Sequence, residues 1–168
     1  MNNNLQFDFV ADKTNNTITM KREFMADRQL VWDCYTKSEL LDQWFAPAPL
    51  TTKTSSMDFR EGGHWLYAMV EPDGKEYWGR MDYLEIRPID GYRGLDGFCD
   101  NNGVLNPELP QAKWDTTFSD FDENTIVHMI VTYDSLADLE TVINMGMQEG
   151  MILTLQKLDD LLSRLRRK

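Results

Sequence analysis

Cysteine and histidine are scarce in this chain, which has 168 residues but only two of each. Cys34 and Cys99 lack the paired spacing of a redox or zinc motif, and His64 and His128 do not form a His-x-x-x-His pattern. We therefore expect free thiols in a reducing cytoplasm, no bound metal and no cofactor.

Long apolar runs are also missing. No stretch approaches the roughly 20 residues that a membrane-spanning helix needs. Residues 1–5 do not resemble the basic and apolar start of a signal sequence. These two absences predict a cytoplasmic protein without a membrane span.

Positive charge is in deficit, since the formal net charge is -11. Binding to nucleic acid requires clustered Lys and Arg to neutralise phosphates, so the sequence predicts no nucleic-acid partner. The basic residues that do cluster, Arg164, Arg166, Arg167 and Lys168, are expected to close a final helix, where cations complement the helix dipole.

Aromatic residues and methionine are plentiful, with five Trp, eight Phe, six Tyr and ten Met. Hydrophobic residues make up 42% of the chain, which is typical of a globular protein. The length suits one domain over residues 1–168 with a substantial core, and methionine makes that core adaptable in shape.

Hydrophobic periodicity and turn residues predict the order of the elements. Short connections between strands indicate an antiparallel sheet. Asp27, Ser38 and Ser135 are predicted helix caps. The inward face of one strand, 77–86, stays undecided, and a bulge near Gly79 is one explanation. Strands are expected at 5–10, 17–25, 50–59, 64–70, 77–86, 92–100, 113–120 and 125–133. Helices are expected at 28–36, from the Ser38 cap to Trp44, from the Ser135 cap to about Asn144 and, after Gly146 or Gly150, to about 166.

Four segments, in order, resemble motifs of a known family. They are Leu-Leu-Asp-Gln-Trp-Phe-Ala-Pro at 40–47, Met-Asp-Phe-Arg-Glu-Gly-Gly-His-Trp at 57–65, Tyr-Leu-Glu-Ile-Arg-Pro at 83–88, and Gly-Met-Gln-Glu-Gly at 146–150 before Leu-Gln-Lys-Leu at 155–158. Together they are similar to the START-like (SRPBCC) superfamily, in the branch named for the activator of the 90-kDa heat-shock protein ATPase.

The resemblance covers roughly residues 18 to 163 and implies an α+β helix-grip fold. In that fold a curved antiparallel sheet wraps around a long C-terminal helix, with a hydrophobic cavity between them and two short helices after the first long strand. This chain departs from the family in two places. Met151 stands where the family often has tryptophan, and the loop from Asn101 to Gln111 is longer than usual.

The predicted function is binding of a small hydrophobic or aromatic molecule, including lipids, in this cavity. The same side chains would equally fill a packed core, and the sequence leaves that alternative open. The residues predicted to line the cavity are Trp44, Phe45, Trp65, Tyr67, Met69, Trp114, Phe118, Met129, Met147 and Met151.

Two other functions stay open. A cyclase/aromatase-like or hydrolytic enzyme would need polar groups inside the cavity, for which Arg80, Tyr67, His128 and Tyr133 are candidates. His128 alternates with apolar neighbours and is predicted to be structural, and no nucleophile motif occurs, so we assign no catalytic residue. A co-chaperone that stimulates a chaperone ATPase ranks last, and a homodimer is left open.

Overall fold

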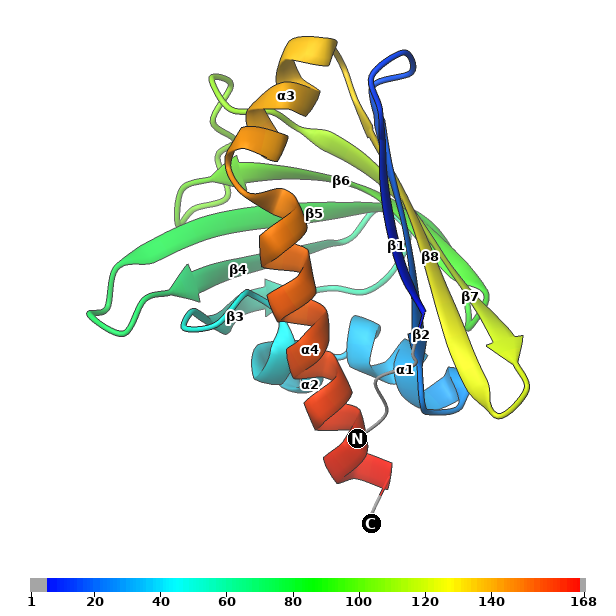
Figure 1. Cartoon of the computed structure of the whole chain (residues 1–168). Coiled ribbons are helices and arrows are strands. Elements are labelled where there is room, and N and C mark those ends of the chain that lie inside the picture. Colours follow the sequence, from blue (N-terminus) through cyan, green and yellow to red (C-terminus); the bar gives the residue numbers. More distant parts are fainter. Residues whose placement is uncertain (1–5, 167–168) are drawn as a thin grey trace.

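The computed structural model describes residues 6–166 and is built on one curved antiparallel sheet of eight strands (Figure 1). The predicted start of the first strand at residue 5, the segment 1–5, and Arg167 and Lys168 lie outside the described residues. The strands are β1 (Phe7–Asp12), β2 (Thr17–Phe24), β3 (Thr51–Met57), β4 (His64–Val70), β5 (Glu76–Arg87), β6 (Gly91–Cys99), β7 (Ala112–Phe121) and β8 (Asn124–Tyr133).

The strand order is β1-β2-β8-β7-β6-β5-β4-β3, with antiparallel pairing throughout. Strands β3 to β8 form the predicted meander, in which each strand returns beside the one before it; the connections are short except for the loop between β6 and β7. Two helices separate β2 from β3 and carry the chain to the opposite edge of the sheet. The last strand of the meander, β8, then pairs with β2.

Four helices complete the fold: α1 (Arg28–Thr36), α2 (Ser38–Trp44), α3 (Leu136–Asn144) and α4 (Met147–Arg166). Figure 1 shows α4 crossing the concave side of the sheet, with α1 and α2 at one end. The buried side of α4 includes Leu155, Leu158 and Leu162, at the spacing of one helical face. This arrangement is the predicted helix-grip fold.

Two of the three predicted helix caps are confirmed. The Asp27 side chain accepts a hydrogen bond from the backbone N–H of Leu30 at 2.8 Å, and Ser135 accepts one from Asp138 at 3.1 Å. The predicted Ser38 cap is wrong, since Ser38 is already the first residue of α2. The N-cap of α2 is Lys37, which also ends α1, and its ammonium group has no acceptor with which to cap the helix.

The undecided strand, β5, turns Gly79, Met81 and Tyr83 toward the concave side. The expected bulge near Gly79 is absent from β5, and the register instead shifts between Tyr83 and Glu85. Gly79 has a different role: it pairs with Tyr67 of β4 and leaves space for that ring. The pairing of β5 is therefore regular from Gly79 to Tyr83, the part that faces the concave side, and becomes irregular after Tyr83.

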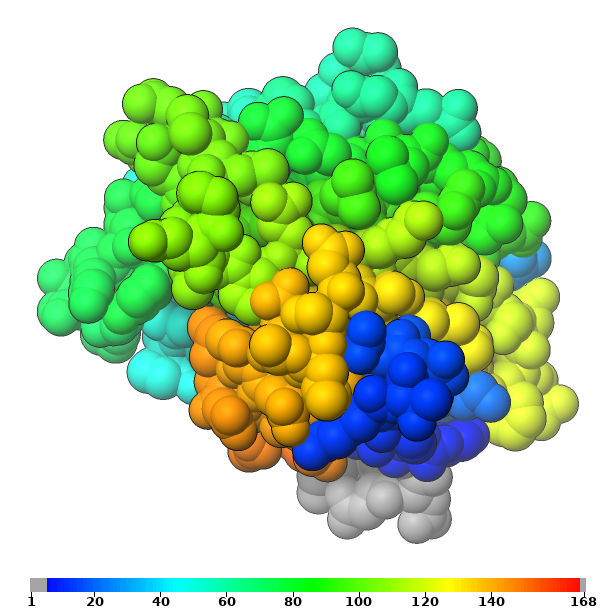
Figure 2. Space-filling view, turned by 90° about the horizontal axis from the view of Figure 1, so that it is seen from above, coloured from blue at the N-terminus to red at the C-terminus, as the bar shows by residue number. Residues whose placement is uncertain are grey.

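The end of the molecule near α3 is formed by segments that are distant in sequence. Figure 2 shows the β1–β2 hairpin beside α3, and Lys13 forms an ion pair with Glu140 across this contact at 3.3 Å. The long loop between β6 and β7 folds back on β6, where the backbones of Cys99 and Leu105 form an isolated antiparallel β-bridge. Among residues 6–166, no helix combines the length and apolar character needed to cross a membrane.

Candidate functional site

Two adjoining spaces lie between the concave face of the sheet and α4. The inner chamber has a volume of about 110 Å³, and the outer space, which is more open, has about 550 Å³. Five residues border both, so they form the boundary between the two spaces. These are Phe45, Tyr67, Asp96, Met151 and Thr154.

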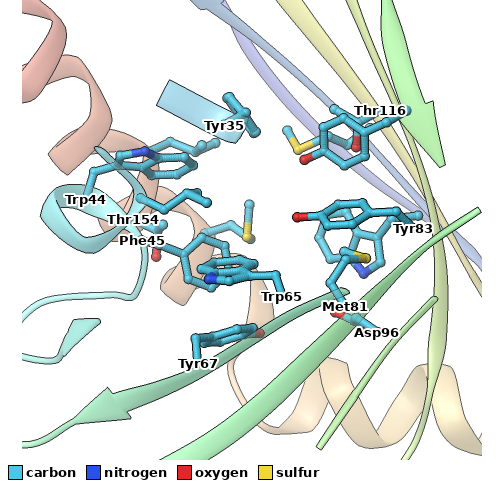
Figure 3. Close-up of a pocket in the computed structure, with 16 residues that line it drawn as sticks. Tyr35, Trp44, Phe45, Trp65, Tyr67, Met81, Tyr83, Asp96, Thr116 and Thr154 are labelled. Carbon is cyan, nitrogen blue, oxygen red and sulfur yellow. The ribbon is translucent and has the colours of Figure 1, made fainter. Parts of the chain in front are cut away.

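The walls of the inner chamber come from the sheet on one side and from the helices on the other. Figure 3 shows Trp44 and Phe45 opposite Met81, Tyr83 and Asp96, with the Tyr83 hydroxyl pointing into the space between. Most of the lining is aromatic or aliphatic, with a few polar groups at defined places. This composition is typical of a small-molecule site.

Four aromatic rings from α2, the residue after it and β4 form a contiguous cluster that lines the chamber. Trp65 and Tyr67 are stacked, with ring centroids 4.1 Å apart and an interplanar angle of 25°. Phe45 meets both of them edge-on, at 5.0 Å from Trp65 and 5.3 Å from Tyr67, and lies 5.7 Å from Trp44. Each ring therefore restricts the orientation of the next, because such contacts favour particular geometries.

Trp44 belongs to the core as well as to the wall. Only 2% of its surface is exposed, its Nε1–H donates a hydrogen bond to the Cys34 carbonyl oxygen at 2.8 Å, and its ring lies 4.9 Å from that of Tyr35. This bond joins the end of α2 to α1. Trp44 thus fixes the position at which the neighbouring Phe45 enters the site.

The segment after Phe45 is held by contacts from two other elements. The Thr52 hydroxyl donates to the Phe45 carbonyl oxygen, and Lys157 Nζ on α4 donates to the carbonyl oxygens of Ala46 and Leu50, both at 3.0 Å. Ala46 has a φ of 98°, which an L-residue rarely adopts. Burial lowers the pKa of Lys157. These bonds retain the unusual backbone that places Phe45 at the boundary.

Asp96 is the acidic residue that lines the inner chamber. It lies in β6 opposite Met81 and Ala112, and cross-strand partners share a face, so its carboxyl faces the concave side. Asp96 is partly buried by neighbouring residues, and it borders both spaces. Burial raises its pKa from 3.8 to about 7, although the N–H groups of Trp114 and Ala112 oppose the shift.

Several polar groups near Asp96 have incomplete hydrogen bonding. The Trp114 indole N–H lowers the pKa of Asp96 by proximity, yet it forms no hydrogen bond of regular geometry with any described residue. The Tyr35 hydroxyl is also without such a partner in the described part of the chain. Burial raises the pKa values of Tyr67 and Tyr133, and the Asp96 charge raises them further. The site therefore holds neutral hydroxyls beside one titratable acid.

Nine of the ten predicted lining residues border these spaces. Phe118 borders neither, because its buried ring packs against Trp32, Tyr35 and Tyr92 behind the wall. That the nine contact a ligand stays a prediction. Trp44, Phe45, Trp65, Tyr67, Trp114, Met129 and Met151 border the inner chamber, and Met69 and Met147 border only the outer space.

The four polar candidates divide between the two faces of the sheet. Tyr67 borders both spaces, and Tyr133 borders the outer one, where its hydroxyl donates to Met147 Sδ at 3.6 Å. Arg80 is engaged elsewhere, in an ion pair with Asp82 and a hydrogen bond to the Gly103 carbonyl oxygen. His128 alternates with buried neighbours and lies on the outer face. Of these four candidates, the two tyrosines are the ones that border the spaces.

Sequence reasoning missed Asp96. The sequence did contain a signal that could have identified it. Asp96 is an acid on the same face of β6 as Tyr92, Gly94 and Phe98. Tyr35, Tyr83 and Thr154 were also missed, because each lies on an element whose inward face the sequence had assigned to packing or left undecided. Among the residues that the structure describes, no group of three or more His, Cys, Asp or Glu could hold a metal ion.

Comparison with solved structures finds the same architecture in several bacterial proteins. Protein Ms6760 from Mycobacterium smegmatis is 29% identical, with 94% of this chain and 96% of that chain covered and a TM-score of 0.85. A protein from Arthrobacter aurescens is 26% identical, covering 94% and 91%, with a TM-score of 0.88. A Staphylococcus epidermidis protein is 28% identical, covering 92% and 94%, with a TM-score of 0.81.

No curated protein sequence matches this chain. The family described as activator of Hsp90 ATPase homolog 1-like protein matches residues 25–163, which include all four motifs found in the sequence. Its fold is compatible with ligand binding and with a co-chaperone role. This chain belongs to the activator of Hsp90 ATPase homolog 1-like family, within the START-like (SRPBCC) superfamily.

Proposed function

We propose that this protein binds a small hydrophobic or aromatic molecule between its curved sheet and α4. The observation that carries the proposal is the pair of adjoining spaces bordered jointly by Phe45, Tyr67, Asp96, Met151 and Thr154. The outer space lies within the range of about 300–1,000 Å³ typical of ligand pockets. A core that was fully packed would have no such volumes.

Native mass spectrometry of the purified protein tests this proposal, since a bound molecule would add a discrete mass. A fluorescence titration with apolar fluorophores and aromatic metabolites is the second measurement. Trp44, Trp65 and Trp114 border the inner chamber, so quenching should saturate near one molecule per chain.

A matched pair of variants locates the signal. Trp65→Phe should reduce the quenching, whereas Trp78→Phe should not, because Trp78 borders neither space. If no member of a broad apolar library binds and a crystal structure contains no internal void, the binding proposal is wrong.

A proton-transfer enzyme is the second candidate, favoured by Asp96 together with the neutral hydroxyl of Tyr67 at the same boundary. A carboxyl whose pKa lies near neutrality suits general acid or base catalysis. Turnover of a bound cyclic or ester substrate that Asp96→Asn abolishes would support this function. Stimulation of a chaperone ATPase on adding the protein would instead support a co-chaperone.

We also propose that residues 1–168 form one domain that acts in the cytoplasm without a nucleic-acid partner. The continuous eight-stranded sheet and the acidic net charge support this view. A homodimer is the remaining proposal on assembly, and sedimentation equilibrium tests it.

A further inference from the structure

The charges around the two spaces have one sign. Asp96 borders both spaces, and Glu71 borders the outer one. Among the described residues, no Lys, Arg or His lines either space. Lys157 lies behind the wall, where the carbonyl oxygens of Ala46 and Leu50 bind its ammonium group.

Asp96 lacks a cationic partner in the residues that the structure describes. The groups that approach it are the N–H of Trp114 and the N–H of Ala112. Tyr67 from β4 and Tyr133 from the end of β8 are the titratable neighbours, and both are neutral. The lining residues of α4 contribute no titratable group. A carboxylate in this setting has lost water without gaining a counter-charge, which is unfavourable.

Aromatic rings line the same two spaces. Phe45 and Tyr67 border both spaces, as Asp96 does, and Trp65 contacts both rings and borders the inner chamber. The faces of such rings attract cations, most strongly when the cation is desolvated. An ammonium group at this boundary would meet a carboxylate beside aromatic side chains, whereas an anionic ligand would be repelled by Asp96 and Glu71.

We propose that the ligand carries a protonated amine on an aromatic or similarly compact apolar body, and that the amine pairs with Asp96 at the boundary of the two spaces. This inference rests on the proposed binding function and narrows its ligand class. The inner chamber, at about 110 Å³, is smaller than the roughly 150 Å³ cavity known to hold benzene. It therefore suits at most part of one ring, and the rest of the ligand extends into the outer space.

Three probes of nearly equal size separate the amine from the apolar body: phenethylamine, phenethyl alcohol and phenylacetate. Isothermal titration calorimetry at pH 8 should show the amine binding at least about tenfold tighter than the alcohol, since a hydrogen bond between charged groups is stronger than one made by a neutral hydroxyl. Phenylacetate should bind weakest.

The variant Asp96→Asn should remove the preference for the amine and leave the affinity for the alcohol within about threefold. Asp82→Asn is the matched control, because it removes the same charge from an ion pair with Arg80 outside the lining of both spaces. The control should retain the preference.

The pH dependence gives an independent readout. Because the pKa of Asp96 is about 7, lowering the pH from 8 to 6 protonates most of the free sites and should weaken amine binding about tenfold. Binding of the alcohol should change little, and Asp96→Asn should lack the effect.

The outcomes distinguish this inference from the binding proposal. If amine and alcohol bind equally, or if the preference survives in Asp96→Asn, the amine proposal is overturned while apolar binding stands. If phenylacetate binds tightest, the assignment of charge is wrong. If none of the three probes nor any member of the apolar library binds, both proposals fail.

Discussion

Gly79 lies directly beneath the ring of Tyr67: a Cβ atom at position 79 would be 2.6 Å from both Cζ and Oη of that ring. Tyr67 on β4 and Gly79 on β5 are cross-strand partners. The missing side chain of one therefore makes room for the aromatic side chain of the other, which borders both spaces.

The first prediction is that Gly79→Ala is destabilising. The added methyl group must displace a buried ring, and overpacking costs about 1 to 3 kcal/mol. Urea denaturation measures the loss. Gly150→Ala in α4 is the control, since its Cβ would make an ordinary contact of 3.8 Å with the side chain of Pro47, and it should stabilise by up to about 1 kcal/mol. Equal stability of Gly79→Ala and the parent would contradict the close packing of Tyr67.

The second prediction concerns pH and Asp96. Its pKa is raised from 3.8 to about 7, so between these values the folded protein holds a proton that the unfolded chain has released. This contribution to the free energy of unfolding is fully present below pH 3.8 and is lost as the pH rises through 7. The loss amounts to at most about 4 kcal/mol.

Thermal and urea unfolding from pH 4 to 8 check this sign. Relative to the parent, Asp96→Asn should gain stability as the pH rises, because the amide carries no charge to desolvate. The half-exposed Asp82 provides the comparison, and Asp82→Asn should show no such trend across neutral pH. Parallel stability curves for the parent and Asp96→Asn would mean that Asp96 is well solvated.

The third prediction separates two adjacent aromatic residues. Trp44→Ala should lower the free energy of unfolding by about 3 to 5 kcal/mol, since it removes a buried ring and the hydrogen bond to the Cys34 carbonyl. Phe45→Leu should cost less than about 1.5 kcal/mol but weaken binding of an apolar fluorophore. Reduced melting of Phe45→Leu with unchanged binding would show that Phe45 acts in packing alone.

The fourth prediction is that Met151→Trp is tolerated. Met151 borders both spaces, so an indole can extend into existing volume. We expect a loss of less than about 1 kcal/mol in stability together with weaker binding of the same fluorophore, because the larger side chain occupies the site. A destabilisation of about 1 to 3 kcal/mol would indicate that the surroundings of Met151 are already filled.

The sequence alone determined the order of the elements, their approximate bounds and the family. These features depend on short-range signals, such as the turn glycines and the Asp27 cap, and on the periodic apolar face of α4. The alternation around His128 also favoured a structural role for that residue, because strand geometry gives alternate residues opposite faces.

Only the tertiary structure decided where open volume remains and which groups reach it. Phe118 shares the alternation of Trp114 but lies behind the wall, since Tyr35 and Tyr92 from other elements cover it. Asp96 was one acid among many until folding brought it between the concave sheet and α4. Void volume and desolvation arise from side chains that are distant in sequence, so no local pattern contains them.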